Sequence, residues 1–232
     1  MSNWMHRQVV FESRLDAGKQ LAEKLDEYKD QSVTVLAIPN GGVPVAMAVA
    51  IALKAELDLI ICRKIPLPLT PEAGFGACAD DGTIILNEEI ARRVGLSKQQ
   101  IEQEATKVRA EIKRRTLLHK KEWSPIPLSG KTVIIIDDGL ASGITMMAAV
   151  ESVRHRHPRE VVAAAPCASA LAVKQLERVA DKVVTVSTGF MPKFVVADFY
   201  RHWYDLSDND VIRYLKEWRM RKFGDIRPPH NR

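Results

Sequence analysis

Short, continuous apolar runs alternate along the chain with longer segments in which apolar residues recur at helical spacing. Runs without polar alternation suit strands that are covered on both faces, as is typical of parallel sheets. We predict such strands at Val33–Ile38, Leu57–Arg63, Val133–Ile136, Val161–Ala165 and Lys182–Val186. The segments that separate or flank them predict helices at Ser13–Lys29, Ala46–Leu53, Thr145–His155, Ala170–Val179 and Ser207–Phe223. This alternation predicts an α/β fold, a parallel sheet with helices on both faces.

One long segment interrupts the alternation between about residues 65 and 87. It is rich in proline and glycine, and two short apolar runs, Phe75–Ala79 and Thr83–Leu86, indicate a hairpin around Asp80, Asp81 and Gly82. Irregular segments of this length in compact domains are usually functional or mobile. We therefore expect a mobile loop that covers a site.

The remaining pattern predicts one main domain with a C-terminal appendage. A capping-box signature, Ser97 with Gln100, begins an inserted helix over about residues 97–120. We assign residues 1–187 to the main domain and residues 188–232 to an aromatic-rich hood with the C-terminal helix. The aromatic stretch either offers a ring to a flat ligand, from Phe190, Phe194 or Phe199, or closes the core.

Composition places the chain among soluble globular proteins. Apolar residues make up 46% and charged residues 27% of the 232 positions, which is ordinary for a folded domain. No apolar window is long enough for a membrane span, and the first residues lack the apolar core of a secretion signal, so we expect a cytoplasmic protein. The net charge of +5 suits an anionic ligand but is too small to indicate nucleic acid.

Cysteine and histidine usage does not indicate a metal centre. Cys62, Cys78 and Cys167 are far apart in apolar surroundings, so we interpret them as small buried hydrophobic residues. The 6 histidines show no metal-ligand spacing. Carboxylates, glycines and cations remain as the candidate functional groups.

The strongest chemical pattern follows the strand predicted at Val133–Ile136. Asp137 and Asp138 come directly after it, at the strand end where open α/β sheets bind ligands. Small residues then leave the backbone exposed as far as Thr145, which opens a predicted helix. Because helix N-termini favour anions, the stretch predicts an anion site beside two acids.

A second strand, glycine turn and helix occurs at Asn40, Gly41 and Gly42. Adjacent glycines let the backbone approach a bound group, but an ordinary strand-to-helix turn has the same composition. Arg63 and Lys64 end the next predicted strand, where they suit a phosphate ligand or are simply solvated surface cations.

The order of an apolar strand, two acids, small residues and then Ser142-Gly143-Ile144-Thr145 closely resembles the signature of the type I phosphoribosyltransferases. The Asn40 turn resembles their pyrophosphate loop, and Arg63-Lys64 resembles the basic pair after their next strand. The longer pattern, including GACADDGTIILNEE and DFYRHWYDLSD, resembles a group of such enzymes without an assigned substrate. The resemblance implies a Rossmann-like fold with a small C-terminal hood.

The resemblance also implies a role for each matching residue. Asp137 and Asp138 would accept hydrogen bonds from the ribose hydroxyls of 5-phosphoribosyl-1-pyrophosphate. The 5-phosphate would be held by Ala141, Ser142, Gly143, Ile144 and Thr145. Pyrophosphate, with Mg²⁺, would be held by Asn40, Gly41, Gly42, Arg63 and Lys64. No residue is assigned as a direct metal ligand, and the family resemblance implies a homodimer.

Such an enzyme attaches ribose 5-phosphate to a nucleobase or similar nitrogen acceptor and releases pyrophosphate. Two positions depart from the family pattern: Ala141 stands where the hypoxanthine–guanine branch has an aspartate, and Asn40 stands where related sequences often have a cation. The alternative is a non-catalytic sensor of the same fold that binds the sugar phosphate or a nucleotide and regulates a partner. A dinucleotide-dependent dehydrogenase is disfavoured because no G-x-G-x-x-G opens a strand–helix unit.

Overall fold

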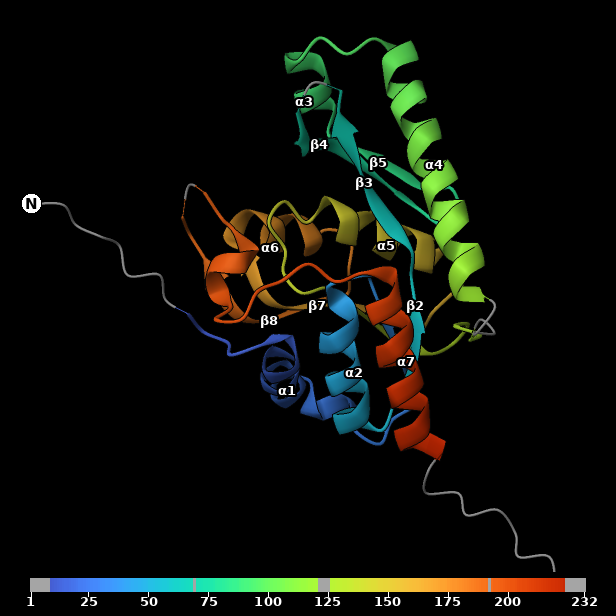
Figure 1. Ribbon diagram of the computed structural model, residues 1–232, viewed down its shortest axis with the longest axis vertical. Coiled ribbons are helices and arrows are strands. Elements are labelled where there is room, and N and C mark those ends of the chain that lie inside the picture. Colours follow the sequence, from blue (N-terminus) through green and yellow to red (C-terminus); the bar gives the residue numbers. More distant parts are fainter. Residues whose placement is uncertain (1–8, 69, 121–125, 192, 224–232) are drawn as a thin grey trace, which may run out of the picture.

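The computed structural model describes residues 9–68, 70–120, 126–191 and 193–223. Its centre is a five-stranded parallel sheet in the order β2-β1-β6-β7-β8 (Figure 1). The strands are β1 (Val33–Ala37), β2 (Glu56–Leu59), β6 (Thr132–Ile136), β7 (Glu160–Ser169) and β8 (Lys182–Gly189). The predicted α/β class is therefore confirmed.

Helices cover both faces of this sheet, as predicted. One face packs against α1 (Arg14–Lys24), α2 (Gly42–Leu53) and α7 (Asp208–Phe223), and the other against α5 (Ile144–Arg154) and α6 (Ala170–Leu176). Because side chains alternate along a strand, Ile134 and Ile136 of β6 enter the first core while Val133 and Ile135 enter the second. The C-terminal helix thus belongs to the main core, where Trp218 is buried.

The helix ends are set by side-chain caps. The Ser13 hydroxyl accepts the Asp16 N–H at the start of α1, as the pattern predicts. This helix is shorter than expected, because a 3₁₀ turn, η1 (Asp26–Tyr28), replaces its last turn. At the start of α4 (Lys98–Lys120), Ser97 and Gln100 accept hydrogen bonds from each other's N–H groups, which confirms the predicted capping box.

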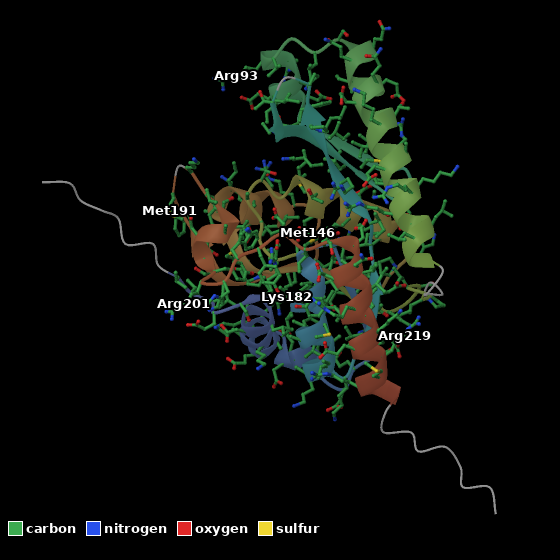
Figure 2. All side chains as sticks on the ribbon, in the orientation of Figure 1. Arg93, Met146, Lys182, Met191, Arg201 and Arg219 are labelled. Carbon is green, nitrogen blue, oxygen red and sulfur yellow. The ribbon has the colours of Figure 1, made fainter. Side chains whose placement is uncertain are left out.

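A separate lobe rises above the main sheet (Figure 1). It consists of the antiparallel sheet β3 (Cys62–Leu67), β4 (Thr70–Ala79) and β5 (Ile84–Leu86), with α3 (Glu88–Arg93) and α4. Residues 65–87 are not irregular as expected, since most of them lie in paired strands. The hairpin around Asp80, Asp81 and Gly82 is confirmed, whereas α3 was not predicted. Figure 2 shows Arg93 near the tip of the lobe and Met146 below it, beside the main sheet.

The single strand predicted at Leu57–Arg63 is also wrong, because β2 ends at Leu59 and β3 begins at Cys62. Arg63 and Lys64 consequently lie inside a strand of the lobe rather than after a strand of the main sheet. Both cations nevertheless line one cavity together with Pro39, which follows β1, and Asp137, which follows β6.

The aromatic-rich segment packs beside the end of β7. Its 3₁₀ turn, η2 (Val196–Phe199), buries Phe199 against Phe11, Cys167 and Tyr200. Phe199 is 7% exposed and Phe190 is 85% exposed. The suggestion that Phe199 stacks on a ligand is therefore wrong, because its ring is enclosed. Residues 224–232 of the predicted C-terminal segment lie outside the described residues.

All three cysteines are buried and free of disulfides, which confirms their interpretation as small hydrophobic residues. Among the described residues, no helix combines the length and the apolar character that a bilayer crossing needs.

Candidate functional site

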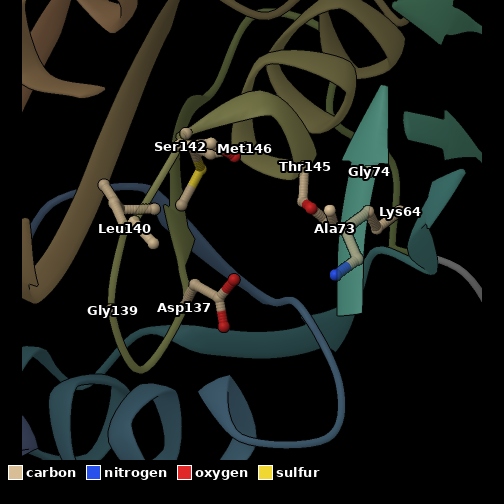
Figure 3. Close-up of a pocket in the computed structure, with 11 residues that line it drawn as sticks. Lys64, Ala73, Gly74, Asp137, Gly139, Leu140, Ser142, Thr145 and Met146 are labelled. Carbon is tan, nitrogen blue, oxygen red and sulfur yellow. The ribbon is translucent and has the colours of Figure 1, made fainter. Parts of the chain in front are cut away.

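Two adjacent acids stand at the carboxyl end of β6, next to the end of β1. The Asp138 side chain is 15% exposed, and its Oδ2 accepts a hydrogen bond from Arg14 Nε at 2.8 Å. Asp137 accepts the N–H of Asp138 at 2.8 Å, and its carboxylate faces a cavity (Figure 3). One acid is thus held inside the protein while the other is presented to a ligand.

The two acids differ in their electrostatic surroundings. Burial raises the pKa of Asp137 well above its usual value, and the charge of Asp138 raises that pKa further. Burial also raises the pKa of Asp138, but the Arg14 guanidinium opposes the rise. Because adjacent acids titrate as a pair, we assign the retained negative charge to Asp138 and the raised proton affinity to Asp137.

Arg14 is itself held by the aromatic segment that follows η2. Its guanidinium carbon lies 3.9 Å from the centroid of the Trp203 ring, and Nη1 donates to Tyr204 O at 2.9 Å. The Tyr200 hydroxyl donates to the backbone oxygen of Asp138 at 2.6 Å. The sequence offered no signal for this clamp, because Arg14 lies far along the chain from its partners and is predicted simply as part of an amphipathic helix.

The turn after the acids is held by β7. Leu140 N donates to Cys167 O at 2.9 Å, and the Ser169 hydroxyl donates to Ala141 O at 2.7 Å. Gly143 adopts a left-handed conformation with φ of 73° and precedes the first turn of α5. First-turn N–H groups of a helix have no acceptor within the helix, so this turn offers donors to an anion.

A cavity of about 350 Å³ lies against this turn and is called the loop cavity below. Asp137, Ser142 and Thr145 line one side, and Lys64 from β3 lines the other. Figure 3 shows the Lys64 ammonium and the Asp137 carboxylate turned toward each other across it. The main sheet contributes an acid and hydroxyl groups, and the lobe contributes a cation.

The turn between β1 and α2 lies against the same acids. A Cβ on Gly41 would lie 1.9 Å from Asp138 Oδ2, and one on Gly42 would lie 2.6 Å from Ile136 O. Both glycines are therefore required for close packing of this turn against the end of β6. The peptide bond between Pro39 and Asn40 is cis.

A second cavity of about 480 Å³, the strand cavity, lies between this turn and β3. Its lining includes Pro39, Arg63, Lys64, Asp137 and Thr145, and the last three also line the loop cavity. The two cavities thus form one cleft. Arg63 is half-buried, and burial lowers its pKa. The structure brings together the acids, the turn after them, the Asn40 turn and the basic pair.

Among the described residues, no group of three or more histidine, cysteine, aspartate or glutamate side chains could hold a metal ion. Asp137 is the acid turned toward the cleft, whereas Asp138 is bound to Arg14. These residues fit an Mg²⁺ ion that is carried mainly by phosphate oxygens and water, because Mg²⁺ keeps several waters and takes only one or two protein carboxylates in such sites.

The chain is similar to known proteins over most of its length. A family model described as the phosphoribosyl transferase domain matches residues 77–197. Two Mycobacterium tuberculosis proteins, from strains CDC 1551 and H37Rv and both named "Putative phosphoribosyl transferase", are 36% identical over 206 residues, which is 89% of this chain. The chain spans about half the length of these relatives, since the match covers 46% of each. The crystal structure of TT1426 from Thermus thermophilus has a TM-score of 0.74 and 34% identity, and the match covers 90% of this chain and 99% of that one.

Proposed function

Because this chain belongs to the phosphoribosyl transferase domain family, we propose that it transfers ribose 5-phosphate from 5-phosphoribosyl-1-pyrophosphate to a nitrogen acceptor and releases pyrophosphate. The observation that carries the proposal is the cleft in which an acid, a helix N-terminus and two cations converge. The acceptor is a nucleobase or a similar nitrogen compound.

The chemistry of the loop cavity suits the ribose 5-phosphate end of the donor. A carboxylate repels phosphate but accepts hydrogen bonds from hydroxyl groups, so Asp137 is suited to the ribose hydroxyls. The turn from Ala141 to Thr145 supplies N–H groups and two hydroxyls, which suit the 5-phosphate. Asp138 does not face the cleft but orients Asp137, because the backbone N–H of Asp138 donates to Asp137 Oδ1.

The strand cavity suits the pyrophosphate. Arg63 and Lys64 line it, and positive charge there stabilises the leaving group as negative charge develops on it. Mg²⁺ bound to the phosphate oxygens would neutralise further charge. Of the two acids, Asp137 is the one that would be available to this ion, because it faces the cleft. Asn40 contributes an amide rather than a cation to the turn beside this cavity.

In the proposed reaction, the bond between ribose C1 and the pyrophosphate oxygen breaks, and a bond from C1 to the acceptor nitrogen forms. Water must be excluded because it competes with the acceptor at C1. The hairpin of β3 and β4 covers the cleft from above, with Ala73 and Gly74 in the wall of the loop cavity. Ala141 ends in a methyl group and takes no proton from the acceptor, which disfavours a simple 6-oxopurine acceptor of the hypoxanthine–guanine type.

Donor binding is tested by calorimetry with 5-phosphoribosyl-1-pyrophosphate and Mg²⁺. We expect the double variant Asp137→Asn, Asp138→Asn to lose measurable binding. The control is Asp26→Asn, which neutralises an exposed aspartate outside both cavities. Unchanged affinity in the double variant would contradict the assignment of the acids.

Transfer is tested by mixing the protein, Mg²⁺, the donor and a panel of purines, pyrimidines and other nitrogen compounds, and by measuring pyrophosphate release. Release that depends on one acceptor identifies the enzyme and its substrate together. Tight donor binding without release in any mixture would instead favour a non-catalytic sensor that uses the same cleft to regulate a partner.

A further inference from the structure

The Asn40 turn carries no cation of its own, although it borders the strand cavity proposed to hold pyrophosphate. Asn40 Nδ2 donates to Leu206 O at 2.6 Å, in the segment before α7. Its Oδ1 accepts a hydrogen bond from Arg115 Nη1 at 2.8 Å. Both ends of the amide are engaged, and one of them meets a guanidinium from α4.

Arg115 reaches this turn from the inserted helix rather than from the main sheet. Its side chain is 12% exposed, with Nε 2.7 Å from Glu111 Oε1 and Nη1 3.1 Å from Asp208 Oδ1. Figure 1 shows α4 running down along the sheet of the lobe, and contacts from Arg114 and Arg115 to Asp208 bring its C-terminal half to the start of α7. One arginine thus joins the lobe, the Asn40 turn and the first residue of α7.

Positive charge is concentrated on this side of the cleft. Arg63 lines the strand cavity, and its side chain makes no hydrogen bond or ion pair with another residue in the described part of the chain. The positive charge of Arg115 lowers the pKa of Arg63, and that of Arg114 does so to a smaller extent, while the charges of Glu111 and Asp208 raise it. Arg63 lines the cavity, and the charge of Arg115 acts on it from behind the lining. Two guanidinium groups within electrostatic range of each other favour a multiply charged anion, because water screens their repulsion poorly in a partly buried site until an anion binds.

We propose that Arg115 supplies from α4 the positive charge that the Asn40 turn lacks, by orienting the Asn40 amide and by adding to the field of Arg63 at the strand cavity. Arg115 is a positioning residue for a diphosphate group. The inserted helix α4 then belongs to the ligand site, and the lobe raises the affinity for pyrophosphate relative to that for a single phosphate. The inference rests on the proposed function, which assigns pyrophosphate to this cavity.

Calorimetry with inorganic pyrophosphate and Mg²⁺ tests this role. We expect Arg115→Gln to lower pyrophosphate affinity about tenfold or more, which corresponds to about 1.4 kcal/mol. Affinity for inorganic phosphate should change by less than about twofold, because the turn after Asp138 is untouched. With an acceptor found by the panel assay, KM for the donor should rise more than kcat falls.

Arg114 provides a matched control on the same helix. It also contacts Glu111 and Asp208, at 2.9 and 3.4 Å, but its side chain is 56% exposed. Arg114→Gln removes the same charge and should leave pyrophosphate affinity within about twofold of the wild type. Equal losses in Arg114→Gln and Arg115→Gln would overturn the proposal, as would wild-type affinity in Arg115→Gln.

Moving a positive charge from α4 to the Asn40 turn gives a second test. Adding Asn40→Lys to Arg115→Gln returns a cation to the turn itself and should restore most of the pyrophosphate affinity; no recovery overturns the proposal. If Arg115→Gln fails to fold, Glu111→Gln tests the idea in the opposite direction, since removing the acid bound to Arg115 must raise pyrophosphate affinity. A wild-type protein that binds neither donor nor pyrophosphate refutes the proposed function itself, whereas wild-type binding that is insensitive to Arg115 refutes only this inference.

Discussion

Replacing Arg14 by methionine tests how strongly the clamp on Asp138 stabilises the fold. Methionine keeps the length and apolar stem of arginine but removes the charge, so that the Asp138 carboxylate, 15% exposed, loses its ion pair. Removing one partner of a buried ion pair typically costs about 3–5 kcal/mol, because the remaining charge stays out of water. The lost hydrogen bond to Tyr204 O falls within that range. Against a total stability of about 5–15 kcal/mol, this is a large fraction.

The same substitution should change the pH dependence of stability. Without Arg14, the largest effect that opposes burial is lost and only hydrogen bonds still oppose it, so the folded-state pKa of Asp138 rises further above its unfolded value. A group with a raised folded pKa contributes stability that is fully present below the unfolded pKa and is lost as pH rises through the folded pKa. The difference between wild type and Arg14→Met should therefore be small in acid and should grow toward neutral and alkaline pH.

Urea unfolding at about pH 5 and about pH 8 measures both effects, since the free energy of unfolding follows from the midpoint and slope. Arg201→Met is the control, because it breaks an exposed pair with Glu12, at 60% and 57% exposure, and should cost less than about 1 kcal/mol. Adding Asp138→Asn to Arg14→Met should recover at least half of the loss. A loss below about 1 kcal/mol at pH 8, or a pH dependence identical to that of the wild type, would refute the reasoning.

Three further substitutions probe the same region by chemical unfolding and donor calorimetry. Gly41→Ala places a methyl carbon 1.9 Å from Asp138 Oδ2, so we expect a loss of about 1–3 kcal/mol and of donor binding. Asp137→Asn removes a carboxyl group whose pKa is raised in the folded protein. In the wild type, the stability that this group contributes is lost as pH rises from 3.8, the ordinary pKa of aspartate, through the folded-state pKa, so the stability of the variant should fall less over this pH range. Tyr200→Phe removes the hydroxyl that donates to Asp138 O and should cost about 1–2 kcal/mol, with no change in the unfolding slope.

The sheet and its carboxyl-end acids were predictable because both signals are local. A strand covered on both faces must be continuously apolar, and acids at its end have few structural explanations. The break between β2 and β3 was not predictable, because no local signal marks it. Ile60 packs into the core of the main sheet and Ile61 into the core of the lobe, so the chain passes between two hydrophobic environments without a polar residue to mark the change.

The components of the site also divide into those with a local sequence signal and those without one. Asp137 to Thr145 is one continuous segment, and its order of acids, small residues and hydroxyls indicates an anion site without knowledge of the fold. Arg14 and Arg115 lie in helices whose patterns indicate packing or solvated surface elements, and their roles depend on partners 124 and 75 positions away. Propensity and periodicity describe neighbours along the chain, and such pairings arise only when the tertiary fold is complete.

The contacts made by Leu206 and by the aromatic segment have a consequence for synthesis on the ribosome. Arg14 and Asp138 are 124 positions apart, and Asn40 and Leu206 are 166 positions apart. Strands β1 and β6 can pair as soon as both have emerged, but the Trp203 face that holds Arg14 and the carbonyl that receives Asn40 are translated only after every strand of the main sheet. Contacts of such long sequence separation form late, because loop closure must precede them. A nascent chain can therefore complete its sheet before these contacts hold Arg14 and Asn40 in place beside the cleft.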